Sequence, residues 1–182
     1  MEILDIGCGP VSKKNGSIGM DIRPAPHVDV VHDLNILPYP FNENKFDYVE
    51  MSHVIEHVNR PLHVLNEVIR ISNNNATIRI ITPHYTSHLS YADLEHFHHL
   101  GWTSFKLLEN SSFLKIKKHK LWFTDIYKIF GISILANLFP HTWEKYFSFI
   151  FPALYVEIFF TVIKTNGNSN SLIENNIYKK GS

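Results

Sequence analysis

The sequence predicts an α/β fold with a mostly parallel central sheet, and the segments around the first glycine turn carry this prediction. Residues 2–6 and 17–22 are short apolar runs that read as buried strands. The turn Gly7-Cys8-Gly9 follows the first of them, and glycine allows the positive φ and the close backbone approach that a ligand needs. Open α/β sheets bind small molecules at the carboxyl ends of their strands, so we expect a ligand at this turn.

The remaining elements follow from apolar periodicity and from the positions of proline and asparagine. Pro61 is expected near the first turn of a helix whose apolar residues recur at helical spacing through Ile71. The asparagines at 73–75 are expected to cap its C-terminal end. The segment 13–16 is too short for a full crossover helix. Further strands are predicted over residues 28–31, 46–52, 76–82, 113–123 and 153–164, the last two as an antiparallel pair.

These elements predict a single domain over residues 1–164. Within it, residues 124–151 form an aromatic segment that we interpret as an insertion or lid. Residues 165–182 are polar and rich in asparagine, have little to bury, and are predicted to be disordered.

The composition excludes some classes of partner. The chain has 17 basic and 17 acidic residues, so no net positive charge attracts nucleic acid. Its one cysteine, Cys8, rules out a disulfide framework and suits a reducing compartment, and we expect this side chain to pack rather than react. Because the sequence opens on a core strand, no signal peptide is predicted and we expect a cytoplasmic protein.

Asp5 lies in the first apolar run, and a second acid, Asp21, indicates a nucleoside ligand, because a carboxylate at the end of the second strand can accept hydrogen bonds from ribose hydroxyls. A dinucleotide fingerprint would place a glycine where Ser12 stands, and Pro10 removes an N–H that a pyrophosphate would use. The acid also follows Gly7 by 14 residues, fewer than the roughly 20 of dinucleotide folds. The pattern therefore favours an adenosyl ligand without phosphates.

Six ordered motifs resemble the class I S-adenosylmethionine-dependent methyltransferases, and more narrowly a compact branch with a short first helix of the methyltransferase domain 11 type. They lie within residues 3–105 and read LDIGCGP, IGMDIRP, VDVVHDLN, LPYPFNENKFDYV, SHVIEHV and TPHYTSHLSYADLEH. The resemblance implies a Rossmann-like, doubly wound sheet of seven strands with helices on both faces and a final antiparallel strand. The helix that precedes the first strand in this family has no counterpart, so we expect an open cofactor site or one covered by another element.

The resemblance also implies a cofactor, S-adenosylmethionine, and the residues that hold it. The glycine turn and Asp5 before it would shape the methionyl pocket. Asp21 would hold the ribose, and Asp33 and Leu34 after the third strand would hold the adenine. The end of the fourth strand would line the methyl group. The residues concerned are Asp5, Gly7, Cys8, Gly9, Asp21, Ile22, Asp33, Leu34, Ser52 and His53.

Histidines crowd the loop after the fifth strand, and the resemblance places this loop on the substrate side. A neutral imidazole can take a proton from an attacking hydroxyl, so His96, His84 and His53 are the candidate catalytic residues. A histidine base favours an oxygen acceptor. By analogy with polysaccharide-cluster methyltransferases, the acceptor is expected to be a sugar or lipid-linked glycan, with a small metabolite as the alternative.

The segment His53-x-x-Glu56-His57 also spells the inverted zinc-peptidase motif. That motif needs one continuous helix, whereas here His53 ends a strand and Pro61 follows closely, so a peptidase is disfavoured. Related methyltransferases of ubiquinone biosynthesis and RNA-end modification can hold a divalent ion at this place, with a later histidine. We predict no metal, and keep a metal-dependent methyltransferase of that type and a non-catalytic binding protein as alternatives.

The apolar segment 126–151 is compatible with core, with a lid or with a surface that contacts a membrane peripherally. Residues 147–163 are mostly apolar, but Pro152 and Glu157 interrupt them and a spanning helix needs about 20 apolar residues. We therefore expect helices followed by the last strand, and leave the peripheral membrane contact open.

Overall fold

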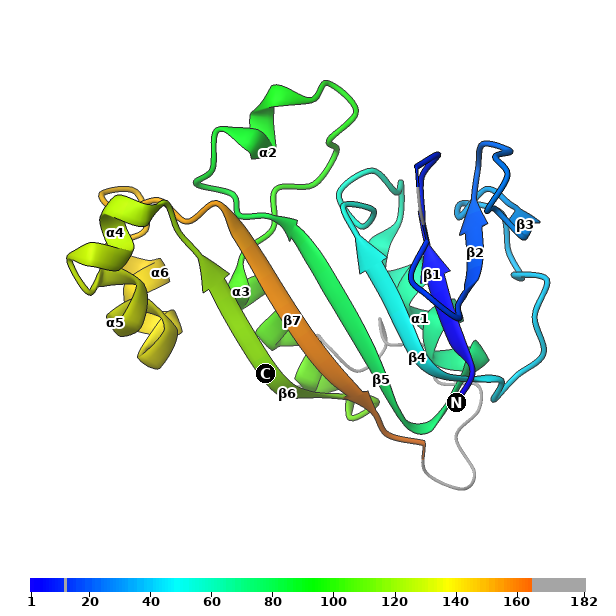
Figure 1. Ribbon diagram of the computed structural model, residues 1–182. Coiled ribbons are helices and arrows are strands. Elements are labelled where there is room, and N and C mark those ends of the chain that lie inside the picture. Colours follow the sequence, from blue (N-terminus) through cyan, green and yellow to red (C-terminus); the bar gives the residue numbers. More distant parts are fainter. Residues whose placement is uncertain (12, 165–182) are drawn as a thin grey trace.

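The computed structural model describes residues 1–11 and 13–164, and the predicted disorder of residues 165–182 lies outside this range. Its centre is a seven-stranded sheet in the order β3-β2-β1-β4-β5-β7-β6 (Figure 1). The strands are β1 (Ile3–Ile6), β2 (Ile18–Asp21), β3 (Val30–Val31), β4 (Phe46–Ser52), β5 (Ser72–Pro83), β6 (Leu114–Trp122) and β7 (Tyr155–Val162). The helices are α1 (Pro61–Ile71), α2 (Leu89–Ala92), α3 (Trp102–Lys106), α4 (Asp125–Ile129), α5 (Ile132–Leu138) and α6 (Pro140–Tyr146), with the 3-10 helix η1 (Leu107–Ser111).

The sheet confirms the predicted mixed architecture. Strands β1 to β5 pair in parallel, with β1 between β2 and β4. Strand β7 lies antiparallel between β5 and β6, so the last two strands form the expected antiparallel pair. The connection between β1 and β2 contains no helix within its described residues, as its length predicted.

The helix predicted from Pro61 ends at Ile71, as expected, but its C-terminal cap was predicted wrongly. The capping residue is Ser72, whose backbone N–H reaches the carbonyl oxygens of Val68 and Ile69. The asparagines at 73–75 already belong to β5, which begins at Ser72. The chain turns directly from helix to strand, and Asn75 takes up a positive φ of 65° within it.

Contrary to the expectation of helices on both faces, α1 and α3 lie on the same face of the sheet, behind the strands in Figure 1. This face is apolar: Val49, Ile78 and Phe160 are fully buried, and Phe105 of α3 packs its ring 6.3 Å from that of Phe160. The connections before β4 are too short to place helices over the opposite face. Strands β4 and β5 therefore alternate apolar and polar residues, a pattern typical of sheets covered on one side.

The opposite face is polar and held by charges that cross the strands. Arg79 on β5 pairs with Glu50 on β4 and, at 2.7 Å, with Glu157 on β7. Lys14 donates to the other oxygen of Glu50 at 2.8 Å, and the indole N–H of Trp122 donates to Glu157 at 2.9 Å. This network satisfies carboxylates that lie at 12% exposure or less, and so stabilises a face that no helix covers in Figure 1.

Helices α4 to α6 lie beyond the edge strand β6 rather than over the sheet (Figure 1). The side chain of Asn137 on α5 attaches them to β6, because it accepts the backbone N–H of Leu121 at 2.8 Å and donates to its carbonyl at 3.0 Å. Among the described residues, no helix has both the length and the apolar character that crossing a bilayer requires.

Candidate functional site

The glycine turn after β1 has the backbone that the sequence predicts. Gly7 and Gly9 adopt φ values of 66° and 69°, which disfavour any other residue. A Cβ on Gly7 would lie 2.3 Å from Val54, whereas a Cβ on Gly9 would meet no atom within 4 Å. Gly7 is therefore required by packing, and Gly9 borders open space in which a ligand can lie against the backbone.

Two acids hold this turn in place. Asp21 accepts the backbone N–H of Gly9 at 2.8 Å with one oxygen and that of Arg23 at 2.9 Å with the other. Asp5 accepts the N–H of Lys14 at 2.8 Å, and burial raises the pKa of its carboxyl above the ordinary 3.8. Each oxygen of Asp21 keeps a second lone pair, so the side chain can order the turn and still accept from a ribose hydroxyl.

Asp33 and Leu34 lie just after β3, at the same edge of the sheet as Asp21. The Oδ1 atom of Asp33 accepts from Asn35, and Leu34 packs partly buried against the core. Ile22 is exposed beside Asp21. A carboxylate next to apolar side chains suits an adenosyl group, and with the space at Gly9 these residues fit S-adenosylmethionine chemically.

Cys8 has the packing environment that the sequence predicts for it. Burial, with the nearby charges of Asp5 and Asp21, raises the pKa of the Cys8 thiol. A Cβ on Gly19 would lie 3.0 Å from the sulfur and 2.9 Å from the carbonyl oxygen of His27. The thiol thus stays protonated and packs against a position where only glycine fits without displacing these atoms.

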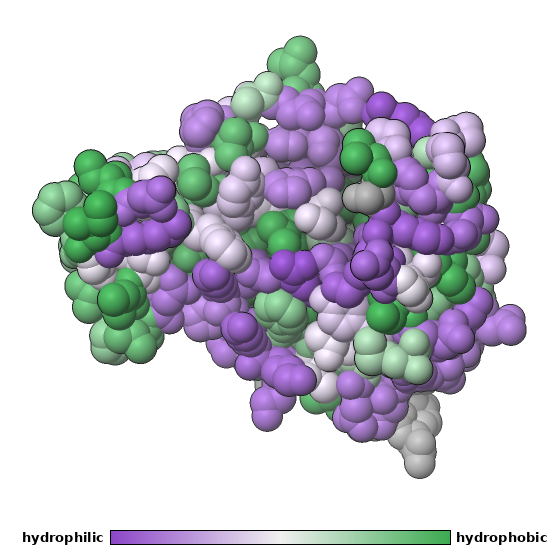
Figure 2. Space-filling model, in the orientation of Figure 1, coloured by the Kyte–Doolittle hydropathy of each residue, from purple (hydrophilic) through white to green (hydrophobic). Residues whose placement is uncertain are grey.

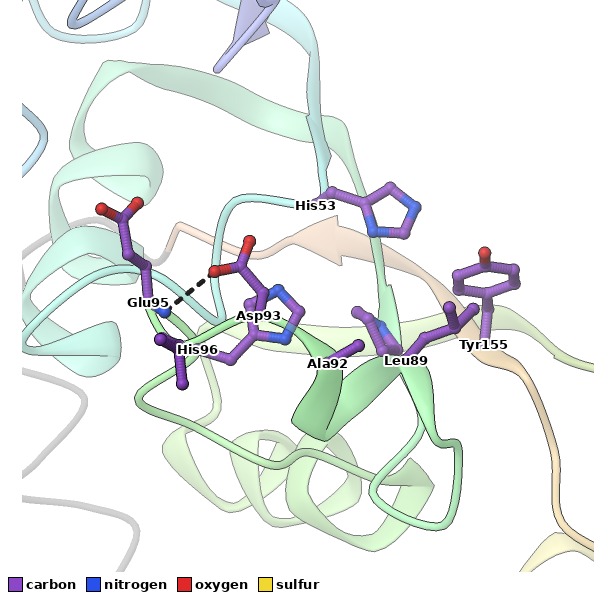
Figure 3. A pocket seen from close by; sticks show the side chains of 9 residues that line it. His53, Leu89, Ala92, Asp93, Glu95, His96 and Tyr155 are labelled. Carbon is purple, nitrogen blue, oxygen red and sulfur yellow. Dashed lines mark hydrogen bonds between the residues drawn. The ribbon is translucent and has the colours of Figure 1, made fainter.

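A cavity of about 650 Å³ opens beside the ends of β4 and β5 (Figure 3). His53 comes from the end of β4, Tyr155 from the start of β7, and their rings meet edge to face at 5.2 Å between centroids. The α2 loop supplies the opposite wall. The lining residues are His53, Pro83, Leu89, Ala92, Asp93, Leu94, Glu95, His96 and Tyr155.

His53 and Ser52 occupy the end of β4, as predicted. His53 has a φ of 57°, which is uncommon for a residue with a side chain, and turns its half-exposed ring toward the cavity. Its Nδ1 atom lies 3.4 Å from Glu56. The strained turn therefore directs an imidazole to the point where the resemblance places the transferred methyl group.

His96 lines the same cavity, and its Nδ1 atom lies 3.1 Å from the carbonyl oxygen of Ser90. An imidazole that donates Nδ1–H to a carbonyl keeps Nε2 as a proton acceptor. The ring of His57 packs 4.6 Å from that of His96. Of the three candidate catalytic histidines, the structure thus brings His96 and His53 to one cavity.

His84 is not among the residues that line the cavity. Its ring is fully buried, with Nδ1 2.7 Å from the hydroxyl of Thr86 and Nε2 3.0 Å from Glu144 on α6. Glu144 also accepts the backbone N–H groups of Trp102 and Thr103. These contacts make His84 a structural link between β5, α3 and α6, a role that its place in the sequence could not distinguish from catalysis.

Glu56, His57 and His96 form a group that could hold a metal ion, with one ligand atom of each within 4.8 Å of the others. Glu56 is 1% exposed, and neither of its oxygens has a hydrogen-bond partner among the described residues. His57 and His96 place Nδ1 on backbone carbonyl oxygens, at 3.0 and 3.1 Å. The resemblance pointed to His53, Glu56 and His57 with a later histidine, whereas the fold groups Glu56 and His57 with His96 and does not include His53.

Sequence reasoning missed the contribution of Tyr155 and Leu89 to the cavity. Tyr155 lies in the apolar strand predicted over residues 153–164, and nothing in that pattern indicates that its ring packs against His53. Residues 124–151, which we interpreted as an insertion or lid, contribute no lining residue among those described.

Comparison with known proteins supports the assignment that the motifs suggested. Residues 4–80 match the family model described as a methyltransferase domain. The comparison with curated proteins found no match.

Among solved structures, an S-adenosylmethionine-dependent methyltransferase from Archaeoglobus fulgidus aligns with a TM-score of 0.62 and 22% identity, over 88% of this chain and 85% of that one. A second, from Mesorhizobium loti, gives 0.58 and 13%, over 88% and 90%. The [4+2]-cyclase SpnF gives 0.57 and 12%, over 90% and 75%. At these identities the likeness shows the fold, and the activity rests on the family match.

The sequence motifs, the methyltransferase domain matched by residues 4–80 and the shared fold together support a class I S-adenosylmethionine-dependent methyltransferase.

Proposed function

We propose that the protein transfers a methyl group to an oxygen of a sugar or lipid-linked glycan that binds in the cavity beside His53 and His96. The observation that carries this proposal is that two imidazoles from distant segments line a single cavity at the end of β4. When bound, S-adenosylmethionine supplies an electrophilic methyl group. The residues of the chain then have to hold the cofactor, orient the acceptor and remove a proton.

Each of these tasks has a candidate group. Asp21 and the backbone of Gly7 to Gly9 are proposed to hold the cofactor, with Asp33 and Leu34 at the adenine. His96, whose Nδ1 is fixed by the carbonyl of Ser90, is proposed to take the hydroxyl proton on Nε2. In-line displacement depends largely on positioning, which the walls of the cavity would supply.

The lining of the cavity supports a polyhydroxylated acceptor. The carboxylates of Asp93 and Glu95 stand beside apolar Leu89 and Leu94, a mixture that suits the hydroxyls and the apolar ring face of a sugar. Asp93 is ionised at neutral pH, because the N–H of Glu95 lowers its pKa below the ordinary 3.8. A lipid-linked acceptor resides in a membrane, so this proposal includes the peripheral contact through residues 126–151.

Calorimetric titration with S-adenosylhomocysteine tests the cofactor site. We expect micromolar binding by the wild type, loss of binding by Asp21→Ala, and no change for Asp125→Ala on exposed α4. Failure of the folded wild type to bind would instead support a non-catalytic binding protein.

A transfer assay with labelled methyl donor and hydroxylated acceptors tests the proposed base. We expect His96→Gln to lower kcat by about 10²- to 10⁴-fold while the affinity for S-adenosylhomocysteine stays unchanged. The matched control is His88→Gln, an exposed histidine of the same loop. Equal activity of the two variants would remove His96 from the mechanism.

A second candidate, a metal-dependent methyltransferase, is favoured by the buried carboxylate of Glu56, which accepts no hydrogen bond from the described residues and has Nδ1 of His53 3.4 Å away. Burying a charged carboxylate without hydrogen bonds is costly, and a divalent cation would satisfy it. Histidines whose other nitrogen donates to a carbonyl are also the usual form of metal-binding histidine. A bound ion would lower the pKa of an acceptor hydroxyl, so that His96 would serve as ligand rather than base.

Metal analysis separates the two candidates. The metal-dependent form predicts about one equivalent of divalent ion per chain, lost in Glu56→Gln and kept in Glu95→Gln, and activity that chelation removes. Activity that survives complete chelation would leave the metal-free form.

A further inference from the structure

Residues 125–151 comprise helices α4 to α6 and the short segment after them, and we call them the helical lobe. The lobe leaves most of its large apolar side chains exposed. Phe149 and Ile129 are each 81% exposed, and α4 buries none of its residues. Figure 2 shows these hydrophobic side chains gathered at the left of the view. The exposed large apolar residues of the lobe are Ile126, Ile129, Phe130, Ile134, Leu135, Leu138, Phe139, Tyr146, Phe147, Phe149 and Ile150.

Such a concentration is unusual for a protein surface. Single exposed apolar residues are normal, whereas contiguous apolar patches mark sites of contact with proteins or membranes. Polar side chains attach the lobe to the rest of the fold: Glu144 is bound to His84 and Thr103, and Asn137 is bound to Leu121. The lobe is thus fixed to the sheet while its apolar side chains are left outward.

The charge around the lobe has one predominant sign. Residues 114–151 contain six lysines and two acids, in a chain whose total charge is zero. Of the acids, Glu144 is buried, and Asp125 pairs with Lys128 at 2.8 Å. Four lysines lie on β6, the strand to which the lobe is attached, and all four are exposed: Lys115, Lys117, Lys118 and Lys120.

The lobe also lies near the end of the sheet where the cavity opens. In Figure 1, α4 follows the carboxyl end of β6 and the α2 loop follows that of β5, and both ends lie at the same edge of the sheet as the end of β4. The α2 loop, which forms one wall of the cavity, exposes three large apolar side chains of its own, with Leu94 at 97%, Tyr91 at 62% and Phe97 at 59%. A surface that bound the lobe would thus lie close to the mouth of the cavity.

We propose that the helical lobe binds the surface of an anionic membrane, with its apolar side chains at the acyl boundary and the lysines of β6 against the lipid phosphates. Apolar helices next to basic residues are typical of proteins that lie on, rather than cross, a bilayer. Anionic headgroups complement the lysines, whereas a second copy of the chain would bring a second set of lysines against them. The proposal deepens the lipid-linked acceptor proposed above, and binding tests it without requiring activity.

Vesicle flotation tests the proposal with the full chain. We expect the protein to float with vesicles of phosphatidylcholine and phosphatidylserine, to bind vesicles of phosphatidylcholine alone at least tenfold more weakly, and to dissociate as salt is raised. No flotation by a folded protein that binds S-adenosylhomocysteine would overturn the membrane surface and leave the methyltransferase intact.

Two pairs of variants locate the surface. Phe130→Ser is expected to weaken vesicle binding about tenfold, while Leu107→Ser on η1, outside the lobe, leaves it unchanged. Lys117→Gln with Lys120→Gln is expected to weaken binding to anionic vesicles only, whereas Lys106→Gln on α3 has no effect. All these side chains are exposed, so folding is preserved. Vesicle binding that none of them alters would contradict the proposal. A dimer that Phe130→Ser dissociates would do the same, since it would assign the surface to a second copy.

Discussion

Helix α1 and the helices of the lobe are similarly apolar in sequence, but α1 is largely buried in the structure and the lobe leaves many apolar side chains exposed. Helix α1 buries six of its eleven residues against the apolar face of the sheet. Helix α5 buries only Ala136, and α4 buries none. The difference lies in position, because α1 connects two parallel strands and must pack on the sheet, whereas α4 to α6 lie beyond its edge. An apolar helix is therefore evidence of burial only where the topology provides a surface to cover it.

The largest change in stability is expected from a substitution in the core. Leu65→Ala in α1, where the side chain is 2% exposed, should lower the free energy of unfolding by about 2–5 kcal/mol. Leu138→Ala in α5, where the side chain is 65% exposed, should change it by less than about 0.5 kcal/mol. Urea unfolding of the two variants measures both. Equal destabilisation would mean that Leu138 is buried in solution, against another copy or another part of the chain.

The next effect concerns the buried carboxylate that joins α6 to the sheet. In Glu144→Gln the backbone N–H groups of α3 meet a neutral amide in place of a carboxylate. This change should lower the free energy of unfolding by about 2–3 kcal/mol. Burial raises the pKa of Glu144, but the hydrogen bonds from His84 and Thr103 lower it more, so it ends below the ordinary 4.5.

This shift gives the variant a pH signature. A carboxyl whose pKa falls on folding stabilises the protein above its unfolded pKa and loses that contribution as the pH falls through the folded pKa. The advantage of the wild type over Glu144→Gln should thus be complete at neutral pH and shrink below about pH 4.5. Unfolding midpoints across this range measure it, with the exposed Glu95→Gln as control. If the difference in stability between wild type and Glu144→Gln did not change with pH, the lost stability would come from the shape of the side chain rather than from its charge.

The smallest effect concerns the attachment of α5 to the edge strand. Asn137→Ala removes the bonds to Leu121 and should cost about 1–2 kcal/mol. Hydrogen exchange should then speed up in α5 and β6 and stay unchanged in α1. Faster exchange in α1 as well would show that the lobe and the sheet unfold as one unit.

Much of the site proposed for the cofactor could be brought together from the sequence, because its signals are local. The glycine turn, Asp21 and Asp33 each follow a short apolar strand, and parallel strands place their carboxyl ends at one edge. The acceptor half could not be predicted in the same way. His84 and His96 lie twelve residues apart in one loop, yet one is fully buried against Glu144 and the other lines the cavity. That distinction depends on Glu144 of α6, which lies 60 residues beyond His84 in the chain.

The sequence by itself determined where most strands lie along the chain, the turn at Gly7 and Gly9, the helix from Pro61 and the methyltransferase motifs, since backbone conformation and apolar period act over a few residues. Only the tertiary structure decided that one face of the sheet is polar, that Glu56, His57 and His96 meet, and that residues 125–151 expose their apolar side chains. These features depend on contacts between segments far apart in the chain, and a residue's own neighbours in sequence do not specify what packs against it.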